Sequence, residues 1–204
     1  MVAELVARHF VLAVLPIVAG TGVAVLLRLL RRDVPGSAGR VLDTLIGFAG
    51  ALPVVAVWVL LPIVTGQPLM RTVHLEIALS LLVLGLVYPA LAGVSRNLAA
   101  ERTVRALGMP LWLRAWWSLR RWLPALSRGL APAWVATVLG VTLAALLHKN
   151  ASNGLGRMLL EGWRADDQLS VIAATLLVMV LAAAGDFGFR LLGRAAGVTP
   201  VEVR

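Results

Sequence analysis

The chain has 204 residues, of which 60% are hydrophobic and 14% carry a formal charge. This composition, together with a mean hydropathy of +0.89, excludes an ordinary soluble domain and indicates a membrane protein. The formal net charge of +9 comes from arginines that flank apolar runs instead of forming one basic face, so we expect no nucleic-acid partner. The absence of cysteine excludes disulfides, thiolate nucleophiles and Cys-ligated metals.

Five apolar stretches follow one another along the chain, and each approaches the about 20 residues that a transmembrane helix requires. Each stretch is apolar around its whole circumference, which suits contact with lipid or with other helices. We therefore expect an all-α polytopic membrane protein with a single transmembrane domain over residues 1–204. The expected spans cover residues 10–30, 44–65, 77–94, 130–148 and 169–189.

Basic residues are distributed unequally between the two sets of connecting segments. Fourteen arginines follow the first, third and fifth expected spans, whereas the other segments hold five basic residues. Cytoplasmic segments are the ones that carry an excess of Lys and Arg. The pattern predicts a multi-pass protein of the plasma membrane, with the N-terminus outside and the C-terminus in the cytoplasm.

The segment between the third and fourth spans, residues 95–129, is the largest polar feature of the chain. It holds seven arginines and one acidic residue, Glu101, and each guanidinium would cost about 2.5–3.5 kcal/mol in the middle of a bilayer. The segment must therefore lie outside the hydrocarbon. Its centre is a helical run that is broken by Gly108 and then by Pro110. The tryptophans that follow, interleaved with arginines, predict an amphipathic helix on the membrane surface.

The segment between the fourth and fifth spans contains Asn153-Gly154-Leu155-Gly156, followed by apolar residues. Two glycines permit a tight turn. We therefore expect a turn at this external loop and then a short helix that returns towards the membrane.

Catalytic and metal-binding signatures are missing from the sequence. The three histidines lack the spacing of metal ligands, and there is no nucleophile elbow or phosphate-binding loop. Asp43 and Asp186 lie near the expected cytoplasmic ends of their spans. Each is expected to cap a helix or to pair with a nearby arginine, Asp186 with Arg190 at the i, i+4 spacing.

The sequence Ala106-Leu107-Gly108-Met109, followed by Leu123-Pro124, resembles the EAA loop in the permeases of binding-protein-dependent ABC importers. In that family a helix that ends in a glycine docks into a groove of the ATPase subunit and transmits its closure. The resemblance implies that Gly108 and its helix contact a cytoplasmic ABC ATPase. The docking loop so implied consists of Ala100, Glu101, Arg102, Thr103, Val104, Arg105, Ala106, Leu107, Gly108, Met109 and Pro110.

The downstream half of the chain is similar to the glycine betaine and choline (osmoprotectant) subfamily of these permeases. The similar residues are Ala136–Leu147, Gly154-Leu155-Gly156, Leu160, Gly162 and Asp167. The resemblance extends over nearly the whole chain and implies the five-helix fold of a type I importer. Arg102 and Thr103-Val104 depart from the family pattern, which has Glu and then Ala-Ala there. These departures favour a heteromeric complex in which a sister permease carries the fuller coupling motif.

The resemblance implies a transport subunit and not an enzyme. No phosphate-binding loop is present, so this chain is expected to bind no cofactor, and ATP and Mg²⁺ would be bound by the partner ATPase. The expected partners are cytoplasmic ABC ATPase subunits, a second permease copy or a homologous sister permease, an external substrate-binding protein, and membrane lipid.

Through the resemblance, the expected solute is a small osmoprotectant such as glycine betaine, choline, carnitine or a related quaternary amine. Aromatic rings attract such cations, and Trp58 and Trp134 are the candidates along the pathway. Two alternatives stay open: a permease for methionine, another amino-acid-like solute or an anion, and a membrane scaffold that does not transport. An integral membrane enzyme would need a polar cluster at one membrane depth, which the sequence does not contain.

Overall fold

The computed structural model describes residues 2–31, 36–66, 72–92, 94, 107–147 and 154–197 of the chain. All regular structure within these residues is helical. In chain order the helices are α1 (Val2–Leu30), α2 (Gly36–Ala51), α3 (Val54–Thr65), α4 (Thr72–Ala92), α6 (Leu111–Leu147), α7 (Leu155–Arg164) and α8 (Gln168–Gly197).

Four of these helices, α1, α4, α6 and α8, are long enough and apolar enough to cross a bilayer, judged by length and composition. They correspond to the expected spans over 10–30, 77–94, 130–148 and 169–189. The expectation of an all-helical membrane protein with several spans is confirmed at this level.

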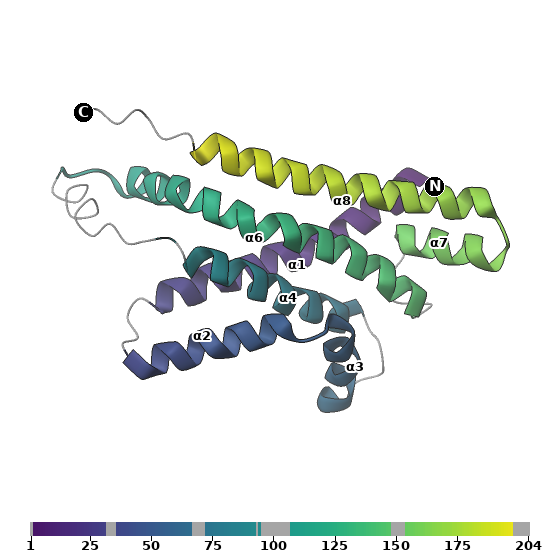
Figure 1. Cartoon of the computed structure of the whole chain (residues 1–204), viewed down its shortest axis with the longest axis horizontal. Coiled ribbons are helices and arrows are strands. Elements are labelled where there is room, and N and C mark those ends of the chain that lie inside the picture. Colours follow the sequence, from purple (N-terminus) through teal and green to yellow (C-terminus); the bar gives the residue numbers. More distant parts are fainter. Residues whose placement is uncertain are drawn as a thin grey trace.

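The expected span over residues 44–65 is wrong as a single helix. The chain is helical up to Ala51 and again from Val54, and Leu52 and Pro53 separate α2 from α3. Proline lacks the N–H that would continue the ladder of α2, and its ring disfavours a helical conformation of the residue before it. α3 has only 12 residues, about 18 Å at 1.5 Å per residue, and Figure 1 shows it turned away from the direction of α2.

The segment over residues 95–129, expected as a polar loop, also differs from this expectation in its described part. The helix α6 begins at Leu111 and runs without a break to Leu147. The tryptophan-rich segment is therefore the first part of a long helix, continuous with the fourth span, and is not a separate surface helix. Pro124 and Pro132 lie inside α6 without ending it.

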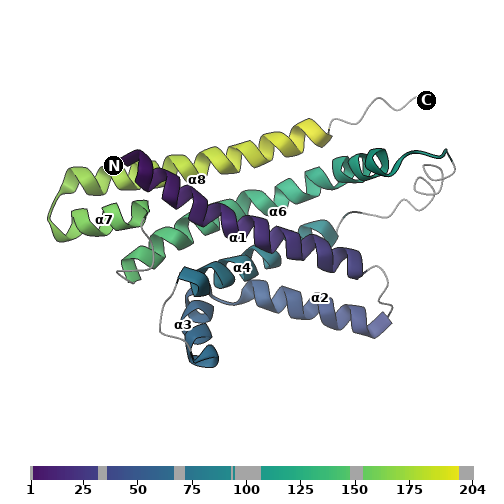
Figure 2. The ribbon, with the colours of Figure 1, turned by 180° about the vertical axis from the view of Figure 1, so that it is seen from behind.

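The helices form one bundle (Figures 1 and 2). α8, α6, α4 and α2 succeed one another across the molecule, and α1 crosses α4 and α6 on one face. α6 packs most extensively against α8, while α1 packs most extensively against α4. The larger core cluster includes Ala13, Val83, Val87 and Val138, which are buried between α1, α4 and α6. The small side chain of Ala13 lets the helices approach closely at its position.

Large apolar side chains also face outwards. On α1 and α8 they include Leu15, Val18, Leu26, Leu176, Met179 and Val180. Contiguous apolar surface of this extent is rare on soluble monomers. Lipid or another protein chain is needed to cover it, in agreement with the length and composition of the four long helices.

Candidate functional site

Arginines gather towards one end of the bundle, which we call the basic end. α1, α4 and α8 end there, and α2 and α6 begin there (Figures 1 and 2). The described arginines towards this end are Arg28, Arg31, Arg40, Arg120, Arg121, Arg128, Arg190 and Arg194. Those towards the opposite end are Arg8, Arg157 and Arg164. The fold thus brings together basic segments that lie far apart in the sequence.

An ion pair and a hydrogen bond tie α1, α2 and α4 together at the basic end. Arg31 Nε donates to Asp43 Oδ2 at 3.3 Å, and the hydroxyl of Tyr88 donates to Asp43 Oδ1 at 2.6 Å. The expectation that Asp43 pairs with a nearby arginine is confirmed. Asp186 likewise accepts a hydrogen bond from Arg190 at 2.7 Å, as its i, i+4 spacing predicts.

The turn before α6 lies at the same end. Gly108 has a φ of +65°, in the left-handed region that residues with a β-carbon rarely adopt. Among the described residues other than its chain neighbours, no atom lies within 4 Å of the position that a β-carbon on Gly108 would take, and the neighbouring Leu107 is 67% exposed. The N–H of Leu113 donates to the carbonyl of Pro110 at 3.1 Å, where α6 begins. The described residues therefore leave this side of the turn uncovered.

The expected docking loop is described only in its last part. Gly108 lies in this left-handed turn and Pro110 directly precedes α6, whereas the helical run expected before the turn falls on residues outside the described ones. Leu107, Gly108, Met109 and Pro110 belong to the described residues, whereas Ala100, Glu101, Arg102, Thr103, Val104, Arg105 and Ala106 lie outside them.

The short helix α7 closes the opposite end of the bundle. Its first residue, Leu155, is fully buried. A β-carbon on Gly156 would lie 2.7 Å from the β-carbon of Ala145 in α6, and one on Gly154 would lie 2.8 Å from the β-carbon of His9 in α1. Only glycine lets the start of α7 approach both helices so closely.

The segment in which a tight turn is expected is described only from Gly154 onwards, because residues 148–153 lie outside the described residues. Gly154 has a φ of −99° and an extended conformation, and Gly156 lies within α7, so neither uses the left-handed region. Their role is close packing of backbones. The expected short helix is present as α7, and Asn153 lies outside the described residues.

Asp167 caps the start of α8, just after α7. Its Oδ1 accepts a hydrogen bond from the Ser170 N–H at 3.2 Å, and its Oδ2 accepts one from the Ser170 hydroxyl at 2.5 Å. These bonds favour the charged carboxylate, the hydroxyl more than the backbone, and hold the pKa of Asp167 below its usual range. The cap satisfies a backbone donor that the helix itself leaves without a partner.

Trp58 and Trp134, the candidates along the pathway, lie in different parts of the core. Trp58 in α3 is 1% exposed and packs with Leu79 and Val141. Trp134 in α6 is 4% exposed, and its Nε1 donates to the carbonyl of Leu181 at 2.9 Å. The structure does not bring the two rings together, and each is enclosed by its own cluster in this conformation.

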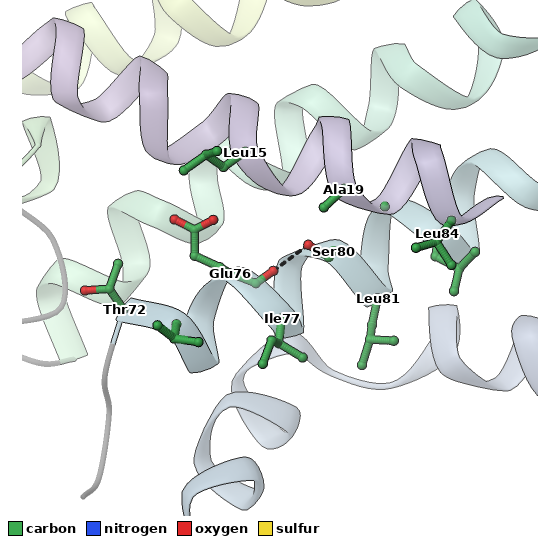
Figure 3. Close-up of a pocket in the computed structure, with 11 residues that line it drawn as sticks. Leu15, Ala19, Thr72, Glu76, Ile77, Ser80, Leu81 and Leu84 are labelled. Atoms are coloured by element: carbon green, nitrogen blue, oxygen red, sulfur yellow. Dashed lines mark hydrogen bonds between the residues drawn. The ribbon is translucent and has the colours of Figure 1, made fainter. Parts of the chain in front are cut away.

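A cavity of about 630 Å³ lies between α1 and α4, towards the end that α7 closes. Leu15, Ile77 and Leu81 contribute to a lining that is largely apolar (Figure 3). The carboxylate of Glu76 points from α4 towards α1 into this space. The hydroxyl of Ser80 donates to the backbone carbonyl of Glu76 at 2.7 Å, which leaves the carboxylate free of that contact.

Glu76 was missed by the sequence reasoning, which placed it at the end of an external loop. α4 begins at Thr72, so Glu76 lies more than one turn inside a membrane-length helix. None of the ion pairs between described residues involves it. The local signal was an acidic residue between Leu75 and Ile77, at the start of an apolar run. A carboxylate in an apolar cavity suits an organic cation, which needs both charge and apolar contact.

Metal-ligating side chains do not gather in the described parts of the chain. No group of three or more His, Asp or Glu side chains is placed there to hold an ion. His9 Nε2 lies 3.2 Å from the carbonyl oxygen of Val138, and His74 is buried in α4. Both rings belong to the packing between helices.

Comparison of the chain with models of protein families, with curated proteins and with solved structures finds no match. Three features of the molecule carry functional information: the Gly108 turn at the basic end, the α7 cap at the opposite end, and the cavity that contains Glu76.

Proposed function

We propose that this chain is the permease subunit of an ATP-driven, binding-protein-dependent ABC importer in the plasma membrane. The observation that supports this most is the open left-handed turn at Gly108, which precedes α6 at the basic end. An excess of arginine favours the cytoplasmic side for this end. Cytoplasmic ABC ATPase subunits would dock against the turn there and would themselves bind ATP and Mg²⁺.

The helix α6 offers a mechanical route from the turn to the other side. It has 37 residues, which corresponds to about 56 Å, and it contacts α1, α4, α7 and α8. A displacement of its first turn reaches α7, because the close contact at Gly156 joins α7 directly to α6. Transport requires two arrangements of the bundle that differ in their contacts with the ATPase, since only differential affinity shifts such an equilibrium.

The solute in this proposal is a small quaternary amine of the glycine betaine, choline or carnitine type. The cavity beside Glu76 supports a cationic solute, since the carboxylate supplies the opposite charge and the apolar lining suits methyl groups. An external substrate-binding protein would deliver the solute to the end that carries α7. A second copy or a sister permease would complete the pathway. Methionine is the alternative solute, and competition between labelled and unlabelled solutes distinguishes the two.

The test of coupling compares two glycines with the same backbone conformation. Gly108 has a φ of +65° and Gly66, after α3, has a φ of +63°, and no atom of the described residues beyond the chain neighbours lies within 4 Å of either β-carbon position. Aspartate at either site meets the same local strain, about 1–2 kcal/mol. We expect Gly108→Asp to lower ATP-driven uptake into proteoliposomes at least about tenfold, or roughly 1.4 kcal/mol of coupling, and Gly66→Asp to leave it unchanged.

Co-purification with the ATPase subunits separates loss of coupling from loss of assembly. Undiminished uptake in Gly108→Asp contradicts the coupling role of the turn. A wild-type complex that assembles with the ATPase but moves none of the solutes would instead favour a membrane scaffold that does not transport.

A further inference from the structure

A second cavity, of about 530 Å³, lies between α6 and α8 on the side of the basic end. Arg128 reaches it from α6, and Arg190 and Arg194 reach it from α8. Ala131 and Pro132 form an apolar wall. Three arginines from two helices thus line one space.

The floor of this cavity is closed by a contact between α6 and α8. A β-carbon on Gly193 would overlap the side chain of Ser127, so α8 approaches α6 here only because residue 193 is glycine. Ser127 is buried, and its hydroxyl donates to the carbonyl of Pro124 at 3.0 Å. The hydroxyl is therefore occupied, and the arginines are the polar groups that face a ligand.

Positive charge around the cavity is only partly compensated. Arg190 forms an ion pair with Asp186 at 2.7 Å, whereas the ion pairs between described residues include neither Arg128 nor Arg194. The planar guanidinium groups of arginine match the geometry of phosphate oxygens. The cavity is therefore suited to a phosphate group.

The surface that leads to the cavity is apolar. Along α8, Val180 and Phe187 precede Arg194 at intervals of seven residues, so the three lie on nearly the same face of the helix. Both apolar side chains are exposed, Val180 by 64% and Phe187 by 60%. An apolar strip that ends at an arginine-lined cavity matches a molecule with hydrocarbon chains and an anionic head.

We propose that this cavity binds the phosphate group of an anionic phospholipid whose acyl chains lie along α8. Basic cavities between membrane-spanning helices suit such headgroups. A free phosphate ion would satisfy the arginines but would make no use of Val180 and Phe187. The site does not depend on the transport function, because neither Gly108 nor Glu76 belongs to it.

Native mass spectrometry of the full chain in detergent tests the site, with phosphatidylglycerol, phosphatidylcholine or inorganic phosphate as the added ligand. Wild type is expected to retain phosphatidylglycerol in preference to phosphatidylcholine. The double variant Arg128→Gln/Arg194→Gln should retain phosphatidylglycerol at least about tenfold less. The control Arg157→Gln/Arg164→Gln removes the same charge at the opposite end and should retain it as wild type does.

Three outcomes overturn the proposal: equal retention of the two lipids by wild type, equal loss of phosphatidylglycerol in both double variants, and displacement of phosphatidylglycerol by inorganic phosphate alone. The last result would assign the cavity to a free anion. If the glutamine variant unfolds, Phe187→Ala tests the lipid chains instead. Its retention of phosphatidylglycerol should fall about threefold with retention of inorganic phosphate unchanged, and undiminished lipid retention contradicts the site.

Discussion

Glu76 occupies a position where its charge is costly. It lies inside a membrane-length helix, in an apolar cavity, and pairs with no described cation. Insertion scales place the cost of an ionised side chain at the centre of a membrane-spanning helix at about 2.5–3.5 kcal/mol, and this value is an upper bound for Glu76, which lies about one turn from the start of α4. A bound cation lowers this cost. The hydroxyl of Ser80 donates to the backbone carbonyl of Glu76 and therefore does not occupy the Glu76 carboxylate. Glu76 is therefore a position at which a cationic solute would gain electrostatic stabilisation.

Replacement of Glu76 by glutamine keeps the size of the side chain and removes its negative charge. We expect uptake of choline into proteoliposomes to fall about tenfold, which corresponds to roughly 1.4 kcal/mol. The control is Glu161→Gln, since Glu161 is exposed on α7 and pairs with Arg157 at 2.7 Å, and its uptake should equal that of wild type. Equal choline uptake by Glu76→Gln and wild type would contradict a role of this cavity in binding the solute.

At the scale of elements, α7 is held in place by backbone proximity. Its buried Leu155 and the close approach of Gly156 to α6 fix the start of the helix, while Asp167 caps the helix that follows. α7 contacts α1, α6 and α8. Any movement of α6 therefore changes the surface that α7 presents at that end of the molecule.

Gly156→Val should lift the start of α7 away from α6. Its side chain would overlap Ala145, and such overpacking costs about 1–3 kcal/mol. The chain has no cysteine, so a single Leu155→Cys reports the change: a membrane-impermeant maleimide should label it several-fold faster with valine at position 156. Gly22→Val is the control, because a β-carbon there meets no atom of the described residues within 4 Å. Labelling that stays as slow as in the control would rule out the close-packing role.

At the scale of the whole molecule, the two ends differ in charge. Eight of the arginines enumerated above lie towards the basic end and three towards the end that α7 closes. This asymmetry is a property of the folded bundle, because α1, α6 and α8 each contribute to it. In a cell whose cytoplasm is electrically negative relative to the outside, such a bundle would insert with its basic end on the cytoplasmic side.

Two exposed side chains at opposite ends allow this orientation to be measured. Leu107 is 67% exposed beside the Gly108 turn, and Trp163 is 75% exposed on α7. In intact cells an impermeant maleimide should label Trp163→Cys, whereas Leu107→Cys should react only after permeabilisation, with a difference of at least about tenfold. Labelling of Leu107→Cys in intact cells would reverse the orientation and remove the basis for docking a cytoplasmic ATPase.

The long helices could be predicted from the sequence because an apolar run of about 20 residues has few other structures open to it. The division between α2 and α3 escaped the same argument. Pro53 is the local signal, but a proline inside an apolar run either kinks a helix or ends it, and Pro16 and Pro89 lie inside α1 and α4. Tertiary packing decides between the two outcomes, and hydropathy does not report packing.

The candidate sites also differ in how far the sequence alone could predict them. The turn at Gly108 follows from local chemistry, since a glycine two residues before a proline interrupts a helix. The role of Gly156 depends on its distance from Ala145, and the second cavity depends on Arg128 lying near Arg194. Both distances arise from contacts of α6 with α7 and α8, which sequence spacing does not encode. Glu76 was missed because the start of α4 was placed too late.

The break at Leu52 and Pro53 has a consequence for the solvent around the protein. Where α2 ends, its last four carbonyl groups have no donor within the helix. Hydrocarbon offers no donor either, so wherever this break lies within the bilayer it must be met by water or by protein. Within a bilayer, acyl chains alone could not surround the backbone at Leu52 and Pro53, and water or another part of the protein would lie there.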